Sequence, residues 1–284
     1  MFYASQTGVI LSLVVRASIC PDSMRSVFSR RELSVDQREM MIEVKSEVQF
    51  NAPRQGIGVV APYDFALDDE YCRWVGSDVS IYATRTPYLE LEVSLEMAEA
   101  VCSHEEVTSG ARSLIAAHPS AVLYACTSGS FVGGRAGERA LRQAIEDAAG
   151  IPAVTTSGAM LAALETLGVQ HVAIATPYDR PVSDQLAKFV TESGYDVVGG
   201  AFLGLSSRIA QVDSATVLRL AQAADSEDAE VVFLSCTNLR TIDVLAKIEE
   251  DLGKPVLSAN QVSLWAALRA GGLSGTLCAG SLGR

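Results

Sequence analysis

The chain has 284 residues, of which 49% are hydrophobic and 20% are charged, so it can bury a substantial core in one large or two small domains. Its formal net charge of −12 excludes a typical nucleic-acid-binding protein, because binding to phosphates needs concentrated Lys and Arg. No apolar run approaches the ~20 residues that cross a bilayer, so no interaction with the membrane is predicted.

Residues 1–50 differ in composition from the rest and show no clean periodicity, which predicts a poorly packed N-terminal extension. The apolar run at 9–15 lacks a basic segment before it and a small-residue cleavage site after it, so it does not resemble a signal peptide. Translation could instead start at Met40 or Met41, in which case most of this extension is absent from the native protein.

From Gln55 onward, short β-rich runs alternate with segments of helical spacing. The eight expected strands are residues 57–61, 79–82, 121–125, 152–154, 171–175, 195–198, 230–235 and 255–257. Helical spacing is clearest at residues 141–148, 159–167, 183–191 and 242–251. Continuous apolar strands that alternate with amphipathic helices are typical of parallel sheets covered on both faces.

The eight strands form two series of four, and the third strand of each series ends in Cys-Thr: Cys126-Thr127 and Cys236-Thr237. A repeat of about 110 residues predicts an α/β fold of two similar Rossmann-like lobes, each a four-stranded, mostly parallel sheet flanked by helices. We expect the first lobe at 51–156 plus 258–284, the second at 157–257, and the active site in the cleft between them.

Cys126 and Cys236 both follow a parallel strand, which is where ligands bind in such sheets. Small polar residues come next, Thr127-Ser128-Gly129-Ser130 and Thr237-Asn238, and offer N–H groups and hydroxyls to an anion. We expect this environment to lower the thiol pKa and favour the nucleophilic thiolate. Two thiols on opposed lobes could then attack or deprotonate a small substrate from one face and protonate it from the other.

A single Cys at a strand end is more often a small buried hydrophobe, and it is the matched pair that favours chemistry. The other cysteines lack this context and are expected to be structural: Cys20, Cys72, Cys102 and Cys278. No CxxC pair or zinc-ligand spacing with a histidine occurs, so neither a disulfide framework nor a metal site is predicted. Reduced thiols in the cytoplasm fit this pattern.

Competing motifs are weak. Residues 56–61 match GxGxxA, but these glycines open the strand and Pro62 breaks any helix after it, which argues against a dinucleotide site. The sequence has no GxSxG elbow and no Walker loop.

Three segments resemble the maleate isomerase, arylmalonate decarboxylase and ectoine-utilisation branch of the aspartate/glutamate racemase superfamily. They are Ala-Cys-Thr-Ser-Gly-Ser at 125–130, Ala-Thr-Pro-Tyr at 175–178 and Ser-Cys-Thr-Asn-Leu-Arg-Thr at 235–241. The resemblance covers about residues 55–272. It implies two Rossmann-like lobes, no cofactor, no metal, and a homo-oligomer (dimer or tetramer) that acts on a small carboxylate.

In maleate isomerases the first-lobe cysteine attacks the double bond and forms a succinyl adduct whose C–C bond rotates. By this resemblance Cys126 is the nucleophile and Cys236 the acid/base, and Tyr178 hydrogen-bonds a substrate carboxylate. Further contacts with substrate are expected from the small polar residues of both turns, Thr127, Ser128, Thr237 and Asn238.

Asp64 is also placed at the substrate, but maleate isomerases carry Asn after the first strand, and a carboxylate there repels a dianion unless it is protonated or points away. Pro62-Tyr63-Asp64-Phe65 is closer to the ectoine-utilisation proteins. Cis–trans isomerisation of maleate is therefore the first prediction, and racemisation of an amino acid or its derivative is the second. Arylmalonate-type decarboxylation needs only the second cysteine and ranks third, before a non-catalytic small-molecule binder.

Overall fold

The computed structural model describes residues 55–275, 277 and 280–283. The chain divides into two units, residues 1–51 and 52–284, and both sheets belong to the second. The predicted N-terminal extension and the alternative start therefore lie outside the described residues. Within them, no helix combines the length and the apolar character that a bilayer crossing requires.

The first sheet has four parallel strands in the order β2-β1-β3-β4. They are β1 (Gly56–Ala61), β2 (Ser80–Arg85), β3 (Ala121–Tyr124) and β4 (Ala153–Thr155). The central strands β1 and β3 are buried along their whole length. Their continuous apolar sequence is what a strand covered on both faces requires.

The second sheet repeats this arrangement in the order β6-β5-β7-β8, again with all strands parallel. Its strands are β5 (His171–Thr176), β6 (Asp196–Phe202), β7 (Val231–Leu234) and β8 (Val256–Ser258). Each strand therefore has a counterpart at the same place in the other sheet. The prediction of two similar four-stranded α/β lobes is confirmed.

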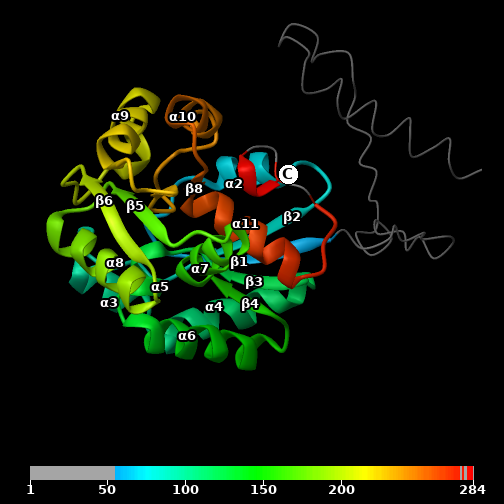
Figure 1. Ribbon diagram of the computed structural model, residues 1–284. Helices are drawn as coiled ribbons and strands as arrows, with labels where there is room; N and C mark the ends of the chain where they lie inside the picture. Colours follow the sequence, from blue (N-terminus) through cyan, green and yellow to red (C-terminus); the bar gives the residue numbers. More distant parts are fainter. Residues whose placement is uncertain (1–54, 276, 278–279, 284) are drawn as a thin grey trace, which may run out of the picture. The chain divides into compact units, whose positions relative to one another are not determined.

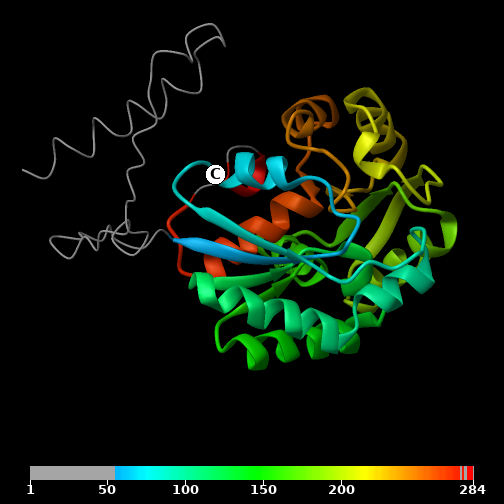
Figure 2. The ribbon, with the colours of Figure 1, turned by 180° about the vertical axis from the view of Figure 1, so that it is seen from behind.

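Helices cover the faces of both sheets. They are α2 (Asp68–Val75), α3 (Leu95–Val101), α4 (His104–Leu114), α5 (Thr127–Phe131), α6 (Gly134–Ala149), α7 (Thr156–Leu167), α8 (Arg180–Glu192), α9 (Ser214–Ala224), α10 (Leu245–Leu252) and α11 (Ala259–Ala270). Short 3-10 helices occupy Ile115–Ala117, Ile209–Gln211 and Ser281–Gly283. In Figure 1, α4 and α6 lie below the first sheet and α2 and α11 above it, and Figure 2 shows the same layers from behind.

Helices α7 and α11 follow the last strand of their sheets and pack against each other. Each begins with a hydroxyl cap: Thr155 accepts from the N–H of Gly158 at 3.0 Å, and Ser258 accepts from the N–H of Gln261 at 3.3 Å. Although α11 follows β8 of the second sheet, it packs on β3 and β4 of the first. The expected boundaries also assign residues 258–284, which include α11, to the first lobe, and these boundaries stay a prediction.

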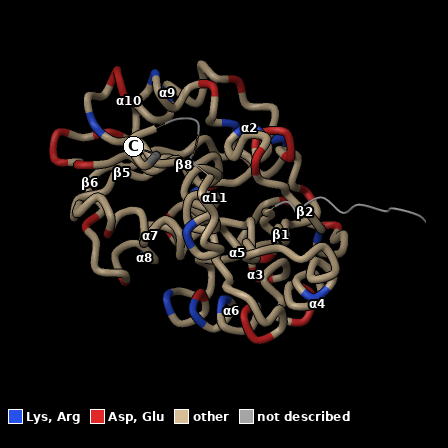
Figure 3. Tube along the Cα trace, turned by 90° about the vertical axis from the view of Figure 1, so that its right-hand side faces the viewer, with Lys and Arg blue, Asp and Glu red and all other residues tan. Residues whose placement is uncertain are grey.

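The inner strands carry no Lys, Arg, Asp or Glu, and Figure 3 shows these charged residues on the helices and loops around them. All eight strands are found where the apolar runs predict them. Two end three or more residues later than predicted: β2 continues to Arg85 and β6 to Phe202. Both are edge strands and partly exposed, so their last residues pair with a neighbour without a continuous apolar pattern.

Candidate active site

Cys126 follows the end of β3 and caps the short helix α5. Its sulfur accepts a hydrogen bond from the N–H of Gly129 at 3.3 Å, and the Ser128 hydroxyl lies 3.7 Å from it. Position 129 needs glycine, because a Cβ there would collide with the Tyr124 hydroxyl and lie 3.2 Å from the sulfur. Cys126 is only 4% exposed, so its thiol faces the interior.

Cys236 occupies the matching position after β7, but its backbone differs. Its φ is 88°, in the left-handed region that residues with a side chain rarely adopt. Its sulfur accepts from the N–H of Asn238 at 3.4 Å, and the N–H of Leu239 closes the turn onto the Cys236 carbonyl at 3.0 Å. A strained turn, and not a helix cap, therefore places this second buried thiol.

The two thiol-bearing turns are bonded to each other. The Thr237 hydroxyl donates to the Ala125 carbonyl at 3.1 Å, and both residues are buried. Ala125 precedes Cys126 and Thr237 follows Cys236, so this bond joins neighbours of the two cysteines across the lobes. The cysteines also interact electrostatically, because an ionised Cys126 contributes to the raised pKa of Cys236. The structure thus brings the two predicted catalytic residues together.

Burial raises the pKa of the Cys126 thiol to about 11 and that of Cys236 to about 12. The N–H of Gly129 and the hydroxyl of Tyr178 lower these pKa values, but loss of hydration outweighs both. The prediction that the turns favour a thiolate is therefore wrong for this structure. Both groups rest as neutral thiols at neutral pH, so each can donate a proton.

Tyr178, which is expected to bind a substrate carboxylate, is hydrogen-bonded to Cys236 and is 2% exposed. Burial is the largest cause that raises the pKa of its hydroxyl well above the ordinary value, so the phenol stays protonated. Its hydrogen bond to Cys236 favours the thiolate of that cysteine and lowers its pKa. The ring meets Phe131 of the first lobe edge-on, with centroids 6.5 Å apart. Tyr178 is thus a fixed donor at the contact between the lobes.

Several buried oxygens around the thiols lack a hydrogen-bond partner among the described residues. They are Thr127 Oγ1, Asp64 Oδ1 and Tyr71 Oη. An unpaired buried polar atom costs free energy, so a cluster of them marks a place where polar atoms of a ligand would be stabilised.

Asn238 connects the turn of Cys236 to the loop after β1. Its amide donates to the Asp64 carbonyl at 3.1 Å and to Asp64 Oδ2 at 3.3 Å, and its oxygen accepts from the N–H of Ala66 at 2.9 Å. Burial raises the pKa of Asp64, and the bond from Asn238 partly opposes that rise. The charge of Asp64 contributes to the raised pKa of both Cys126 and Cys236, so this carboxylate lies within electrostatic range of both thiols.

A cavity of about 260 Å³ opens beside Asp64 and Asn238. Its walls come from the loops after β2 and β6 and include Leu91, Glu92, Val93 and residues 206–211. Two bonds between the lobes close its rim: the N–H of Val93 donates to the Ser206 carbonyl at 2.8 Å, and the Ser206 hydroxyl donates to Glu92 Oε2 at 2.7 Å. Neither cysteine lines this cavity, but it reaches Asp64 and Asn238, and the N–H of Asn238 donates to the sulfur of Cys236.

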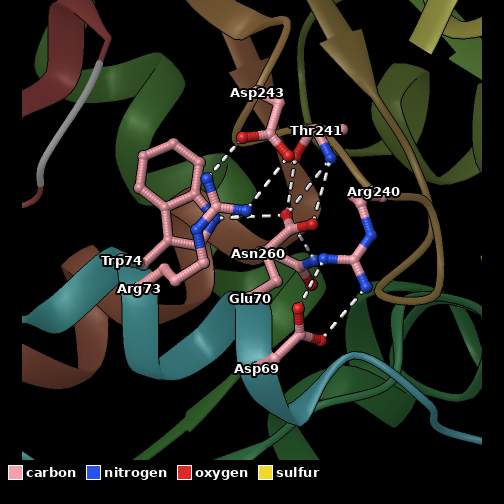
Figure 4. Close-up of polar contacts among 8 residues, drawn as sticks. All are labelled: Asp69, Glu70, Arg73, Trp74, Arg240, Thr241, Asp243 and Asn260. Atoms are coloured by element: carbon pink, nitrogen blue, oxygen red, sulfur yellow. Dashed lines mark hydrogen bonds and ion pairs between the residues drawn. The ribbon is translucent and has the colours of Figure 1, made fainter.

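Sequence reasoning missed two neighbouring residues of α2, Glu70 and Tyr71, which are both buried. Glu70 bonds to the second lobe, as Figure 4 shows. Charges on both thiols contribute to the raised pKa of Tyr71, after burial and Glu70, so its unpaired hydroxyl lies near the site. The signal in the sequence was a carboxylate at position 70 on a helix face otherwise formed by Leu67, Tyr71 and Trp74.

Two further cysteines, Cys72 and Cys102, are separate from this site. Cys72 is exposed on α2, and Cys102 is half-buried at the end of α3, where its thiol bonds to the Glu99 carbonyl at 3.2 Å. Cys20 and Cys278 lie outside the described residues. Within the described part of the chain, no group of three or more His, Cys, Asp or Glu side chains could hold a metal ion.

Comparisons with known proteins identify one family. The family described as arylmalonate decarboxylase matches residues 91–282. The chain is 37% identical over 172 residues to the arylmalonate decarboxylase of Bordetella bronchiseptica, which covers 59% of this chain and 72% of that protein. It is 30% identical over 140 residues to a maleate isomerase of Pseudomonas putida, covering 48% of this chain and 56% of that relative.

Solved structures give the same result. A double mutant of arylmalonate decarboxylase in its liganded form has a TM-score of 0.75 at 32% identity and covers 80% of this chain and 98% of that chain. A maleate cis-trans isomerase of Nocardia farcinica with a covalently bound succinylcysteine intermediate has a TM-score of 0.74, covering 81% and 98%. Its identity is 22%, so that similarity shows the fold alone.

Proposed function

Because this chain belongs to the arylmalonate decarboxylase family, whose curated relatives are enzymes, we propose that it is an isomerase of a small carboxylate with Cys126 and Cys236 as reacting groups. The observation that carries the proposal is the bond between Thr237 and Ala125, which holds two buried thiols from opposite lobes at one site. Decarboxylation of the arylmalonate type needs only the second-lobe thiol, so the presence of the first-lobe thiol, Cys126, favours isomerase chemistry.

Our first candidate is cis–trans isomerisation of maleate. Cys126 adds to one carbon of the double bond, and Cys236 gives its proton to the other carbon as it takes the proton of Cys126. The C=C bond becomes a single bond that rotates, and the reverse transfer expels Cys126 and leaves fumarate. Two neutral thiols at rest suit this exchange, because no net proton is gained or lost.

The second candidate is racemisation next to a carboxylate, and Asp64 favours it. Its charge raises the pKa of both thiols, so an ionised Asp64 would repel a second negative charge on a substrate bound between them. One cysteine, once ionised, would remove the α-proton, and the thiol of the other would deliver a proton to the opposite face. The charge that develops on the carboxylate would be stabilised by fixed donors.

In both reactions we expect the substrate carboxylate to bind hydroxyl and amide donors. Tyr178, Thr127 and Ser128 are buried around the thiols, with Asn238 beside Cys236. Thr237 is buried there too, but its hydroxyl already donates to the Ala125 carbonyl. The unpaired Oγ1 of Thr127 supports its role as a donor. Closing the site removes water and strengthens these hydrogen bonds to an anion.

The test is a proton NMR assay of the reduced protein with maleate in D₂O. Vinyl signals of fumarate that appear with the native protein, and not after thiol alkylation, would support the first candidate. Amino acids with one carboxylate form the second arm, in which loss of the α-proton signal would support racemisation. Release of CO₂ from phenylmalonate would instead show a decarboxylase and contradict the isomerase proposal.

If all three arms stay negative while the protein still binds a small carboxylate, the catalytic proposal is wrong and a binding protein remains. The predicted homo-oligomer is a separate proposal. Light scattering coupled to size-exclusion chromatography would show a dimer or tetramer, and a monomer would contradict it.

A further inference from the structure

We propose that Glu70 is a positioning residue that fixes the Cys236 loop, defined here as residues 236–244, against the first lobe. The proposal rests on the proposed function in so far as it treats Cys236 as a reacting thiol. Glu70 itself is expected to act through this loop and not on the substrate.

Glu70 is a carboxylate with no exposed surface, held by neutral donors (Figure 4). Both of its oxygens accept from the N–H of Thr241 at 3.2 Å, and Oε1 also accepts from the Thr241 hydroxyl at 3.1 Å. Asn260 Nδ2 donates to Oε1 at 3.1 Å, and Trp74 Nε1 at 3.2 Å. Three segments far apart in the sequence, α2, the Cys236 loop and α11, therefore meet at one buried side chain.

Two ion pairs flank this carboxylate at the surface. Arg240 pairs with Asp69 at 2.7 and 3.1 Å, and Arg73 pairs with Asp243. Both pairs join α2 to the Cys236 loop, but the Arg73 and Asp243 side chains are each 47% exposed. Exposed ion pairs contribute little stability because water and salt screen them. The buried bonds of Glu70 are therefore the stronger connection at this end of the loop.

The Cys236 loop needs such a connection because it contains no helix or strand and starts from a strained backbone. A φ of 88° at Cys236 persists only when surrounding contacts hold it. Thr237 and Asn238 bind the first lobe near the thiol, while Thr241 binds it at the distal part of the loop. If Thr241 were released, the loop could move and displace the sulfur of Cys236 relative to Cys126.

The test compares Glu70→Gln with a matched control, Glu138→Gln. Glutamine keeps the shape of Glu70 but replaces one acceptor oxygen with a donor, so the N–H of Thr241 loses one of its two acceptors. Glu138 on α6 is also a buried first-lobe carboxylate, 3% exposed. It accepts a hydrogen bond at 2.6 Å from the hydroxyl of Thr155, the last residue of β4 in the same lobe. Both variants change one buried carboxylate to an amide, and only one of them touches the Cys236 loop.

The rate of alkylation by iodoacetamide is measured for each cysteine by peptide mass spectrometry. In Glu70→Gln we expect Cys236 to react about tenfold faster, because a lost charge-assisted bond lets the loop open more often, while Cys126 changes by less than about twofold. In the proposed assay, we expect kcat to fall more than about tenfold with KM nearly unchanged. Glu138→Gln should leave the Cys236 rate unchanged.

An unchanged Cys236 rate in folded Glu70→Gln, or equal acceleration of both cysteines, would overturn the proposal. If Glu70→Gln does not fold, Thr241→Val removes one donor to the same carboxylate, and an unchanged Cys236 rate in that variant overturns it equally. Alkylation needs no substrate, so the positioning role can be confirmed even if the isomerase proposal fails.

Discussion

The hydroxyl of Thr237 in the second lobe donates to the carbonyl of Ala125 in the first lobe at 3.1 Å, 112 positions away in the sequence. Each partner is the immediate neighbour of a buried cysteine. This bond makes the two thiol-bearing turns parts of one site, because neither turn can shift without stretching or breaking it. Of the two Cys-Thr dipeptides, only that of the second lobe supplies the threonine that makes the connection.

Replacing Thr237 by Val should lower the free energy of unfolding by about 1–3 kcal/mol, because the buried Ala125 carbonyl loses its donor. Urea denaturation measures this change. Thr86→Val is the control, since the Thr86 hydroxyl is buried but has no hydrogen-bond partner among the described residues. Equal losses in the two variants would show that the Thr237 bond contributes nothing specific.

Cys126→Ser and Cys236→Ser should each reduce the proposed isomerase rate by more than ~100-fold, as expected for loss of a nucleophile or an acid/base. Serine is nearly isosteric, so both variants should fold. Steady-state kinetics and the urea midpoint of each variant check these two statements. A variant that keeps near-normal activity would contradict the two-thiol mechanism.

The raised thiol pKa values, about 11 for Cys126 and about 12 for Cys236, predict a strong pH dependence. In the unfolded chain both thiols titrate near their ordinary pKa of about 8.5. The folded state holds these protons more tightly, so their contribution to stability is complete below that pH and is lost as pH rises through 11 and 12. Urea unfolding at pH 7 and pH 10 should show a larger loss of stability in the native protein than in the double Cys→Ser variant. Equal losses would mean that neither thiol has a raised pKa.

Asp64→Asn should lower the pKa of both thiols, because the charge of Asp64 contributes to raising each of them. Cys126 and Cys236 should therefore be alkylated faster than in the native protein at pH 9. Glu92→Gln is the control, since Glu92 lines the same cavity but bonds to Ser206 at the rim. Unchanged rates in Asp64→Asn would show that Asp64 carries no charge at the site, which would remove the argument against a dianionic substrate.

The sequence by itself determined the two-lobed α/β fold and the place of both cysteines in it. Continuous apolar runs such as those of β3 and β7 are local signals, because a strand covered on both faces must be apolar throughout. A residue that directly follows such a strand is then known to lie at the carboxyl edge of the sheet. The pairing of Cys126 with Cys236 followed from the repeat of one motif.

The tertiary structure decided what no local pattern encodes. The turns after Cys126 and Cys236 look alike in sequence, yet one is an extended helix cap and the other a left-handed turn held by the opposite lobe. Their N–H groups pointed to low thiol pKa values, but burial by distant segments raised both. Glu70 is one of three consecutive acidic residues at the start of α2, and only its contacts with Thr241 and Asn260 distinguish it from the other two. Burial, charge interaction and backbone strain depend on residues more than a hundred positions apart, so only the assembled lobes determine them.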